Sequence, residues 1–194
     1  MFKKIFHREK KEKGKYKKPY YTLLSCHTDK VLDLSQGGEH AGSLVIWKSN
    51  KGENQSFTFV PCGNGEYHIK CRINKTYLTV EGPHNGARVF AGKKSHQANQ
   101  KFRIDEKTPD GKEHIIYTYC GKVLDICEAS KKEGAQVIQY DFNGGKNQMW
   151  MFCEPNNITS SSSEVEWSVI SLNLLKLCHL PQIISREKWE QFTS

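Results

Sequence analysis

Residues 134–150 read Gly-Ala-Gln-Val-Ile-Gln-Tyr-Asp-Phe-Asn-Gly-Gly-Lys-Asn-Gln-Met-Trp and end in an Asn-Gln pair, one further residue and an aromatic side chain. The same ending occurs twice earlier, as Asn54-Gln55-Ser56-Phe57 and Asn99-Gln100-Lys101-Phe102. The asparagines of the three copies are 45 and 48 residues apart. A pattern that recurs at such a spacing is typical of a fold built from repeated units.

Each copy also begins with a similar short segment. Residues 31–34, 77–80 and 123–126 read Val-Leu-Asp-Leu, Tyr-Leu-Thr-Val and Val-Leu-Asp-Ile, and their leucines are 46 residues apart. Turns that contain glycine separate these segments from the Asn-Gln endings. The two landmarks therefore define three copies of one unit.

The local signal inside each copy is for strands. Short segments rich in β-branched and aromatic residues alternate with turn residues, at 20–25, 31–34, 44–47, 57–60, 67–71 and 115–119. No segment between residues 19 and 153 sustains a helical period. Three copies of about four strands each predict an all-β structure of about 12 strands that closes on itself and leaves few exposed edges.

The three Asn-Gln-x-aromatic endings resemble the QxW signature of ricin-B-type (R-type) β-trefoil lectins. The resemblance covers residues 19–153, and the third copy is the most similar. It implies a β-trefoil with pseudo-threefold symmetry and repeats at about 20–61, 65–107 and 112–153. It also implies a non-enzymatic module that binds glycans or glycoconjugates of the galactose or N-acetylgalactosamine type.

A sugar-binding site needs hydrogen-bonding groups for the hydroxyls and an aromatic ring for the apolar face of the sugar. In R-type lectins a carboxylate comes from the first strand of the repeat, the aromatic platform from its third region and an amide from the signature asparagine. In the first repeat these positions hold Asp33, Trp47 and Asn54, with Gln55 behind them. In the third repeat they hold Asp125, Tyr140, Asn147 and Gln148.

The second repeat lacks two parts of this set. Thr79 and Gly92 stand where the other repeats have the carboxylate and the aromatic residue. We therefore expect no sugar binding there, although Gln100 and Phe102 should still serve the core.

Each candidate residue also has a structural interpretation. The signature glutamines and the aromatics after them suit buried, hydrogen-bonded core positions. Asp33 and Asp125 could cap turns, and Trp47 and Tyr140 could be core residues. The sequence departs from strong R-type sites because Val45 and Ile138 take positions that often hold a sugar-bonding glutamine, and no cysteine pair matches the disulfide that often braces each repeat.

The basic residues concentrate before the repeats. Residues 1–18 contain nine Lys or Arg and two Glu, whereas the other 176 residues contain 20 basic and 19 acidic residues. Such a run predicts a disordered, solubilising arm, with attraction to an anionic surface as the alternative. We predict no specific nucleic-acid partner. The arm has no apolar core of a secretory signal, so the expected location is cytoplasmic.

The pattern stops after Cys153. Residues 154–164 are predicted to form a Ser-rich linker. Residues 165–194 are an apolar extension that could end in a short helix, and no apolar run in the chain is long enough for a membrane span. The extension could fold back onto the trefoil, or it could bind a protein partner or a second copy of the chain.

No enzymatic motif is present. The sequence contains no nucleophile elbow, zinc-protease helix or phosphate-binding loop, and its histidines lack the spacing of zinc ligands. We therefore expect no catalysis, no metal and no cofactor. The competing hypothesis is a trefoil that serves as a protein-interaction scaffold, such as a protease inhibitor or a cytoskeletal binder, because fold alone does not determine function.

Overall fold

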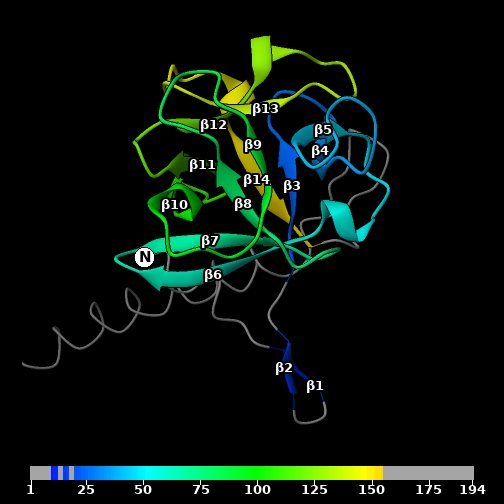
Figure 1. Cartoon of the computed structure of the whole chain (residues 1–194), viewed down its shortest axis with the longest axis vertical. Coiled ribbons are helices and arrows are strands. Elements are labelled where there is room, and N and C mark those ends of the chain that lie inside the picture. The colour runs from blue at the N-terminus through cyan, green and yellow to red at the C-terminus, as the bar shows by residue number, and fades with distance from the viewer. Residues whose placement is uncertain (1–9, 13–14, 18–19, 155–194) are drawn as a thin grey trace, which may run out of the picture. The chain divides into compact units, whose positions relative to one another are not determined.

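A computed structural model describes residues 10–12, 15–17 and 20–154 (Figure 1). The linker from residue 155 and the apolar extension lie outside these described residues. So does most of the basic arm, within which β1 (Lys10–Glu12) and β2 (Lys15–Lys17) pair as a small hairpin. The prediction of disorder for the rest of the arm therefore stays a prediction.

Residues 20–154 form one sheet of 12 strands. The strands are β3 (Thr22–Ser25), β4 (Val31–Leu34), β5 (Leu44–Trp47), β6 (Phe57–Gly63), β7 (Glu66–Cys71), β8 (Tyr77–Val80), β9 (Val89–Gly92), β10 (Phe102–Glu106), β11 (Glu113–Thr118), β12 (Val123–Ile126), β13 (Val137–Tyr140) and β14 (Trp150–Cys153). Each repeat therefore contributes four strands, and all the pairings are antiparallel.

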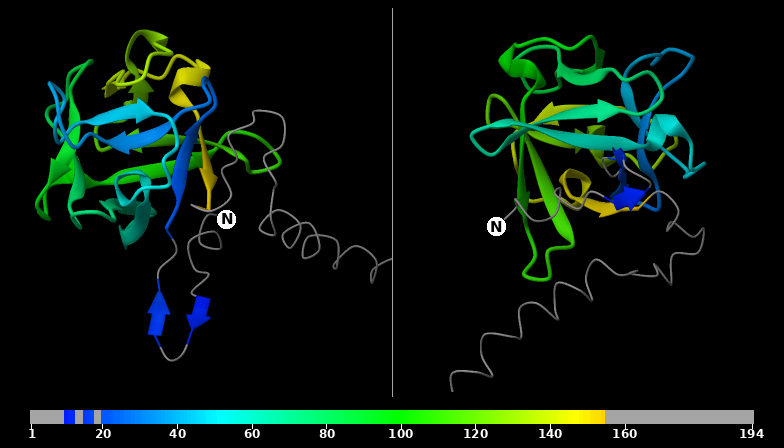
Figure 2. Two further views of the ribbon diagram at one scale, coloured as in Figure 1. Left: turned by 90° about the vertical axis from the view of Figure 1, so that its right-hand side faces the viewer. Right: turned by 90° about the horizontal axis from the view of Figure 1, so that it is seen from below.

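Six of the strands close into a barrel. The order β3-β14-β11-β10-β7-β6 follows the hydrogen-bonded pairs, and a bridge between Tyr21 and Phe57 returns from β6 to the start of β3. Figure 2 shows β3 and β14, the first and last strands of the trefoil, side by side. Closure leaves none of the six barrel strands with a free edge.

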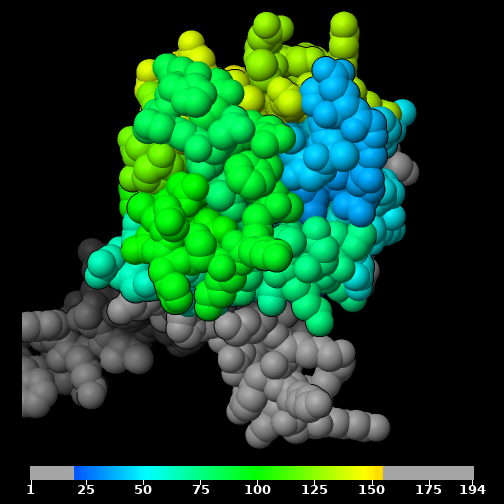
Figure 3. Space-filling model, in the orientation of Figure 1, coloured from blue at the N-terminus to red at the C-terminus, as the bar shows by residue number. Residues whose placement is uncertain are grey.

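The other six strands form three hairpins, β4-β5, β8-β9 and β12-β13. Single bridges join these hairpins to one another in a triangle: Ser43 with Phe90, Val45 with Gln136, and Arg88 with Ile138. Segments of the first repeat (blue) and the second repeat (green) accordingly share one face of the molecule in Figure 3. This barrel with three capping hairpins is the predicted β-trefoil, so the fold prediction is confirmed.

The repeated landmarks form the core. Leu32, Leu78 and Leu124 are fully buried, as are the aromatic residues that end the signatures, Phe57, Phe102 and Trp150. Burying a large apolar side chain stabilises a fold by about 1.5–3 kcal/mol. The three copies of the pattern thus recur because each of them supplies one third of a shared core.

One local feature was not predicted. The Asn-Gln pairs lie in single 3₁₀ turns, η2 (Glu53–Gln55), η3 (Ala98–Gln100) and η5 (Lys146–Gln148), and a fourth such turn is η4 (Cys127–Ala129). A 3₁₀ turn of three residues is too short to show a period in the sequence. Among the described residues, no helix is long and apolar enough to cross a membrane.

Candidate functional site

The signature glutamines make the same hydrogen bonds in all three repeats. In the first, the side-chain Nε2 of Gln55 donates to the Lys48 carbonyl at 2.9 Å, and its Oε1 accepts from the Asn50 backbone N–H at 2.8 Å. Gln100 and Gln148 make the equivalent pairs of bonds. All three side chains are buried, so they hold the loop before each 3₁₀ turn from inside the protein.

The carboxylate of the first repeat lies beside this glutamine. Asp33 on β4 accepts from Nε2 of Gln55 at 2.7 Å. Nδ2 of Asn54 lies 2.9 Å from both oxygens of the same carboxylate. Asp33, Asn54 and Gln55 therefore form one connected cluster, although 21 residues of chain separate Asp33 from Asn54.

The third repeat builds the same cluster. Asp125 on β12 accepts from Nε2 of Gln148 at 2.6 Å and from Nδ2 of Asn147 at 3.0 Å. The Asn147 amide lies 3.4 Å from the Ile126 carbonyl as well. The carboxylate is thus held by two amide groups, as in the first repeat.

The second repeat differs at both of the positions that the sequence singled out. Gln100 donates to the hydroxyl of Thr79 at 2.9 Å, which replaces the bond to a carboxylate. Asn99 donates to the Val80 carbonyl at 2.9 Å, a bond equivalent to the longer contact of Asn147 with the Ile126 carbonyl. Gly92 offers no ring, and any Cβ at that position would lie 2.5 Å from the Thr79 hydroxyl.

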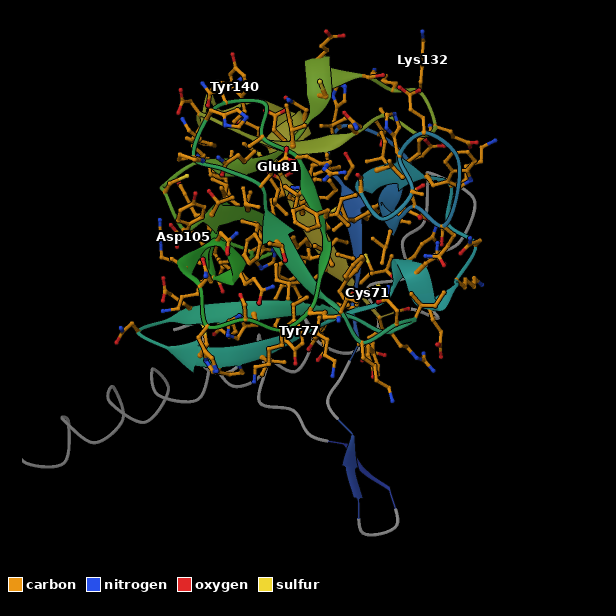
Figure 4. All side chains as sticks on the ribbon, viewed as in Figure 1. Cys71, Tyr77, Glu81, Asp105, Lys132 and Tyr140 are labelled. Carbon is orange, nitrogen blue, oxygen red and sulfur yellow. The ribbon has the colours of Figure 1, made fainter. Side chains whose placement is uncertain are left out.

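An exposed aromatic ring accompanies each carboxylate. Asp33 pairs with Val45 across β4 and β5, and Trp47 follows two residues later on the same face of the hairpin. Asp125, Ile138 and Tyr140 have the same register on β12 and β13. Trp47 and Tyr140 are 43% and 42% exposed, so they lie outside the core. Figure 4 shows Tyr140 at the outer edge of the molecule, at the end where β12 and β13 lie.

Each platform borders the neighbouring repeat. Gly134 of the third repeat lies against the Trp47 ring, where an added Cβ would be 3.4 Å from the indole, and its backbone N–H donates to the Ile46 carbonyl. Beside Tyr140, Asn85 of the second repeat exchanges two hydrogen bonds with Asp141. The two sites are therefore built across the boundaries between repeats, which the sequence did not reveal.

The two carboxyl groups are deeply placed and lack a cationic partner. Asp33 and Asp125 are 5% and 4% exposed, and none of the ion pairs within residues 20–154 involves either of them. Burial raises the pKa of both groups, and the amide hydrogen bonds oppose this shift. Each carboxylate is thus a negative acceptor fixed in position by neutral donors.

Two glycines also shape the candidate sites, and the sequence reasoning missed them. Gly52 and Gly145 each precede the 3₁₀ turn, two residues before the asparagine. A Cβ on Gly52 would collide with Oδ1 of Asn54, and a Cβ on Gly145 would collide with Oδ1 of Asn147. Their backbone angles are ordinary, so glycine is needed for space.

The second repeat supports this interpretation of the glycines. Gln97 takes the equivalent position there, with nearly the same backbone angles. The asparagine two residues later, Asn99, bonds a backbone carbonyl, in a repeat where Thr79 replaces the carboxylate. A Gly-x-Asn-Gln sequence, which occurs only in the first and third signatures, was therefore the signal that could have identified the two glycines.

The carboxylate, the amide and the exposed aromatic residue together provide the contacts that binding of a small polar ring compound requires. The carboxylate and the amide oxygen accept hydrogen bonds from hydroxyls, and the exposed ring stacks against an apolar face. Within the described part of the chain, no group of three or more His, Cys, Asp or Glu residues could hold a metal ion.

The comparisons with known proteins agree with the fold. A family model for ricin-type β-trefoil lectin domain-like proteins matches residues 7–91 and 98–172. The designed threefold-symmetric protein ThreeFoil is 31% identical, with a TM-score of 0.63 over 69% of this chain and 96% of its own. No curated protein matches the sequence.

Two natural structures are also similar. An exo-β-1,3-galactanase from Clostridium thermocellum is 25% identical, with a TM-score of 0.65 over 70% of this chain but only 30% of the galactanase. A ricin B-like lectin from Macrolepiota procera, whose structure is a complex with lactose, is 22% identical, with a TM-score of 0.61 over 75% of this chain and 99% of the lectin.

Proposed function

The chain belongs to the family of ricin-type β-trefoil lectin domain-like proteins, and we propose that it binds carbohydrate at two sites, in its first and third repeats. The sites are Asp33, Trp47, Asn54 and Gln55, and Asp125, Tyr140, Asn147 and Gln148. The second repeat takes part in the fold only.

One observation carries this proposal. In the first and third repeats, a buried carboxylate with no cationic partner is held by an asparagine and a glutamine, and an exposed aromatic residue accompanies it. The second repeat has neither the carboxylate nor the aromatic residue at these positions. The glutamine bonds to the loop are common to all three repeats, so they explain the fold. The carboxylate and the ring are not needed for that fold, because the second repeat folds without them.

The proposed ligands are glycans that end in galactose or N-acetylgalactosamine, bound without a metal and without catalysis. Two of the similar proteins act on or bind galactose-containing sugars, a galactanase and a lectin in complex with lactose. A carboxylate beside an aromatic ring suits a sugar with vicinal hydroxyls on one face and C–H groups on the other.

The direct test is binding of the full-length chain to an array of immobilised glycans, with free galactose as competitor. We expect binding to glycans with terminal galactose or N-acetylgalactosamine, and loss of that binding in the presence of free galactose. Absence of sugar-competed binding would contradict the proposal, and capture of one protein partner that free sugar does not displace would favour the protein-interaction scaffold.

Replacing Gly145 with alanine should weaken binding at the third site by about tenfold, since the displaced Asn147 amide loses one charge-assisted hydrogen bond worth about 1.5 kcal/mol. The fold should remain, because the second repeat carries Gln97 at the equivalent position. The measurement is a galactose titration of G145A in the Asp33→Thr background, which leaves only the third site. Gln97→Ala is the matched control and should bind as its parent does; an unchanged affinity in G145A would show that the glycine is not required.

Acidification should weaken sugar binding. Burial raises the pKa of Asp33 and Asp125, so both take up a proton at a higher pH than an exposed carboxyl group, and the protonated form accepts hydrogen bonds poorly. Because these pKa values are raised on folding, the two groups stabilise the fold at low pH and lose that contribution as the pH rises through the raised values. Sugar binding should therefore decline as the pH falls, although protonation of these two groups does not itself destabilise the fold.

The pH titration needs a check on folding, because another group acts in the opposite direction. Burial lowers the pKa of His114 to about 4, so the stability that His114 contributes above its ordinary pKa is lost as the pH falls toward that value. Circular dichroism at each pH identifies the range in which the chain stays folded. Constant galactose affinity across that range, down to the pH at which exposed carboxyl groups protonate, would count against a carboxylate in the sites.

A further inference from the structure

The surface beyond Tyr140 continues with aromatic residues. Phe142 follows two residues after Tyr140 and is 39% exposed. The rings of Phe142 and Tyr117 lie 6.4 Å apart between centroids. Tyr117 on β11 pairs with Val123, which in turn pairs with Tyr140, and Phe142 lies in the loop that follows β13.

Two cationic side chains lie over these rings. The ammonium nitrogen of Lys107 is 5.5 Å from the centre of the Phe142 ring, and the guanidinium carbon of Arg103 is 4.2 Å from that of Tyr117. Arg103 is the second residue of β10 and Lys107 directly follows the strand, four residues later, which is the spacing of side chains on one side of a strand. Figure 4 labels their neighbour Asp105 on the same left-hand side of the view as Tyr140, but lower down.

The charges around the strip are unequal. Arg103 pairs with Asp105, and Asp141 pairs with Lys122 at 2.6 Å. None of the ion pairs found within residues 20–154 involves Lys107, whose side chain is exposed. The strip formed by Tyr117, Phe142, Arg103 and Lys107 therefore keeps one positive charge without a carboxylate partner.

This strip lies beside the third site, and its cations Arg103 and Lys107 come from the end of the second repeat. The residue five positions before the signature asparagine is Phe142 in the third repeat, but Ser49 in the first and Lys94 in the second. Neither of these offers a ring beside the platform. The two candidate sites are therefore alike at the carboxylate but differ in what lies next to it.

We propose that the third site continues into a second subsite, formed by Phe142, Tyr117 and Lys107, which takes an anionic saccharide residue linked to the sugar on Tyr140. This subsite rests on the proposed function of the third site. The Phe142 ring stacks on the apolar face of the second residue, and Lys107 binds its carboxylate or sulfate group. The first site, with Ser49, takes the terminal sugar alone.

The test compares three disaccharides on the full-length chain that carries Asp33→Thr, which leaves only the third site. The disaccharides are galactose linked to a neutral sugar, to the same sugar carrying a sulfate ester, and to a uronic acid. We expect the anionic ligands to bind about fivefold more tightly than the neutral one, as a partly exposed ion pair allows. The gain should shrink as salt is added, and the sulfate and uronic acid arms distinguish the two sources of charge.

Substitutions assign the gain to the strip. Lys107→Gln should remove the preference for the anionic ligands and leave the neutral affinity unchanged, whereas Phe142→Ser should weaken all three ligands. The control Lys94→Gln removes a positive charge at the position of the second repeat that corresponds to Phe142, and it should change nothing. Equal affinities of the parent chain for neutral and anionic ligands, or a preference that survives Lys107→Gln, would overturn the subsite, whereas a complete lack of neutral disaccharide binding would overturn the proposed function itself.

Discussion

The double variant Asp33→Thr and Asp125→Thr is expected to lose carbohydrate binding altogether. Each change removes a fixed negative acceptor, and a hydrogen bond to a charged group contributes about 1.5–3 kcal/mol, or about ten- to hundredfold in affinity. The asparagine of each site loses its anchor as well, because the Asn54 and Asn147 amides both donate to the carboxylate. Calorimetric titration with galactose measures the affinity of the parent chain and of the double variant.

Threonine stands at this position in the second repeat, where its hydroxyl lies 2.5 Å from the place of a Cβ on Gly92, so beside Trp47 or Tyr140 a threonine must take another rotamer. Thr79 occupies this position in the second repeat and accepts the glutamine bond at 2.9 Å. The melting temperature of the double variant, measured beside that of the parent, separates loss of the sites from loss of structure. Thr79→Ser is the control, and its affinity should match the parent. A folded double variant that binds galactose normally would exclude these carboxylates from the sites.

Replacing Gln148 with leucine is expected to destabilise the fold by about 3 kcal/mol or more, because each buried polar group left without a partner costs about 1–3 kcal/mol. The glutamine side chain bonds the Asp125 carboxylate, the Asp141 carbonyl and the Asn143 backbone N–H, and it is fully buried. Leucine has a similar size but can replace none of these bonds. Urea unfolding of the full-length chain measures the free energy.

The second repeat provides the comparison that assigns the glutamine to the fold. Gln100→Leu should cost nearly as much stability as Gln148→Leu, since Gln100 makes the same loop bonds, although its third bond goes to the neutral Thr79 hydroxyl. Galactose binding should be unaffected by Gln100→Leu. A Gln100→Leu variant as stable as the parent would contradict a structural role for the signature glutamines.

The fold was predictable because its determinants recur in the sequence. Leu32, Leu78 and Leu124 mark one core position three times, and three matches in register exclude coincidence in a way that one match does not. Strands at 31–34 and 44–47 were predicted with the bounds that the structure has. The 3₁₀ turns were not predicted, because a three-residue turn has no periodic signal.

The candidate site was predictable only in part. The sequence identified the carboxylates, the amides and the rings, and the structure brings the carboxylate and the amides of each repeat into contact. It could not reveal that Trp47 lies against Gly134, because that contact joins two repeats. The role of Gly52 and Gly145 was hidden for a different reason. Their backbone angles are ordinary, and the clash that a Cβ would make with the asparagine side chain is visible only in the folded structure.

A nuclear magnetic resonance titration of the full-length chain with galactose distinguishes the first and third repeats, which we propose bind sugar, from the second, which we propose does not. The signals to follow are the indole N–H of Trp47 and the side-chain amides of Asn54, Asn99 and Asn147. We expect the Trp47, Asn54 and Asn147 signals to shift with added sugar, while the signal of the Asn99 amide, which is bonded to the Val80 carbonyl, stays in place. Shifts at Asn99 alone, or no shifts at Asn54 and Asn147 at saturating galactose, would contradict the proposal.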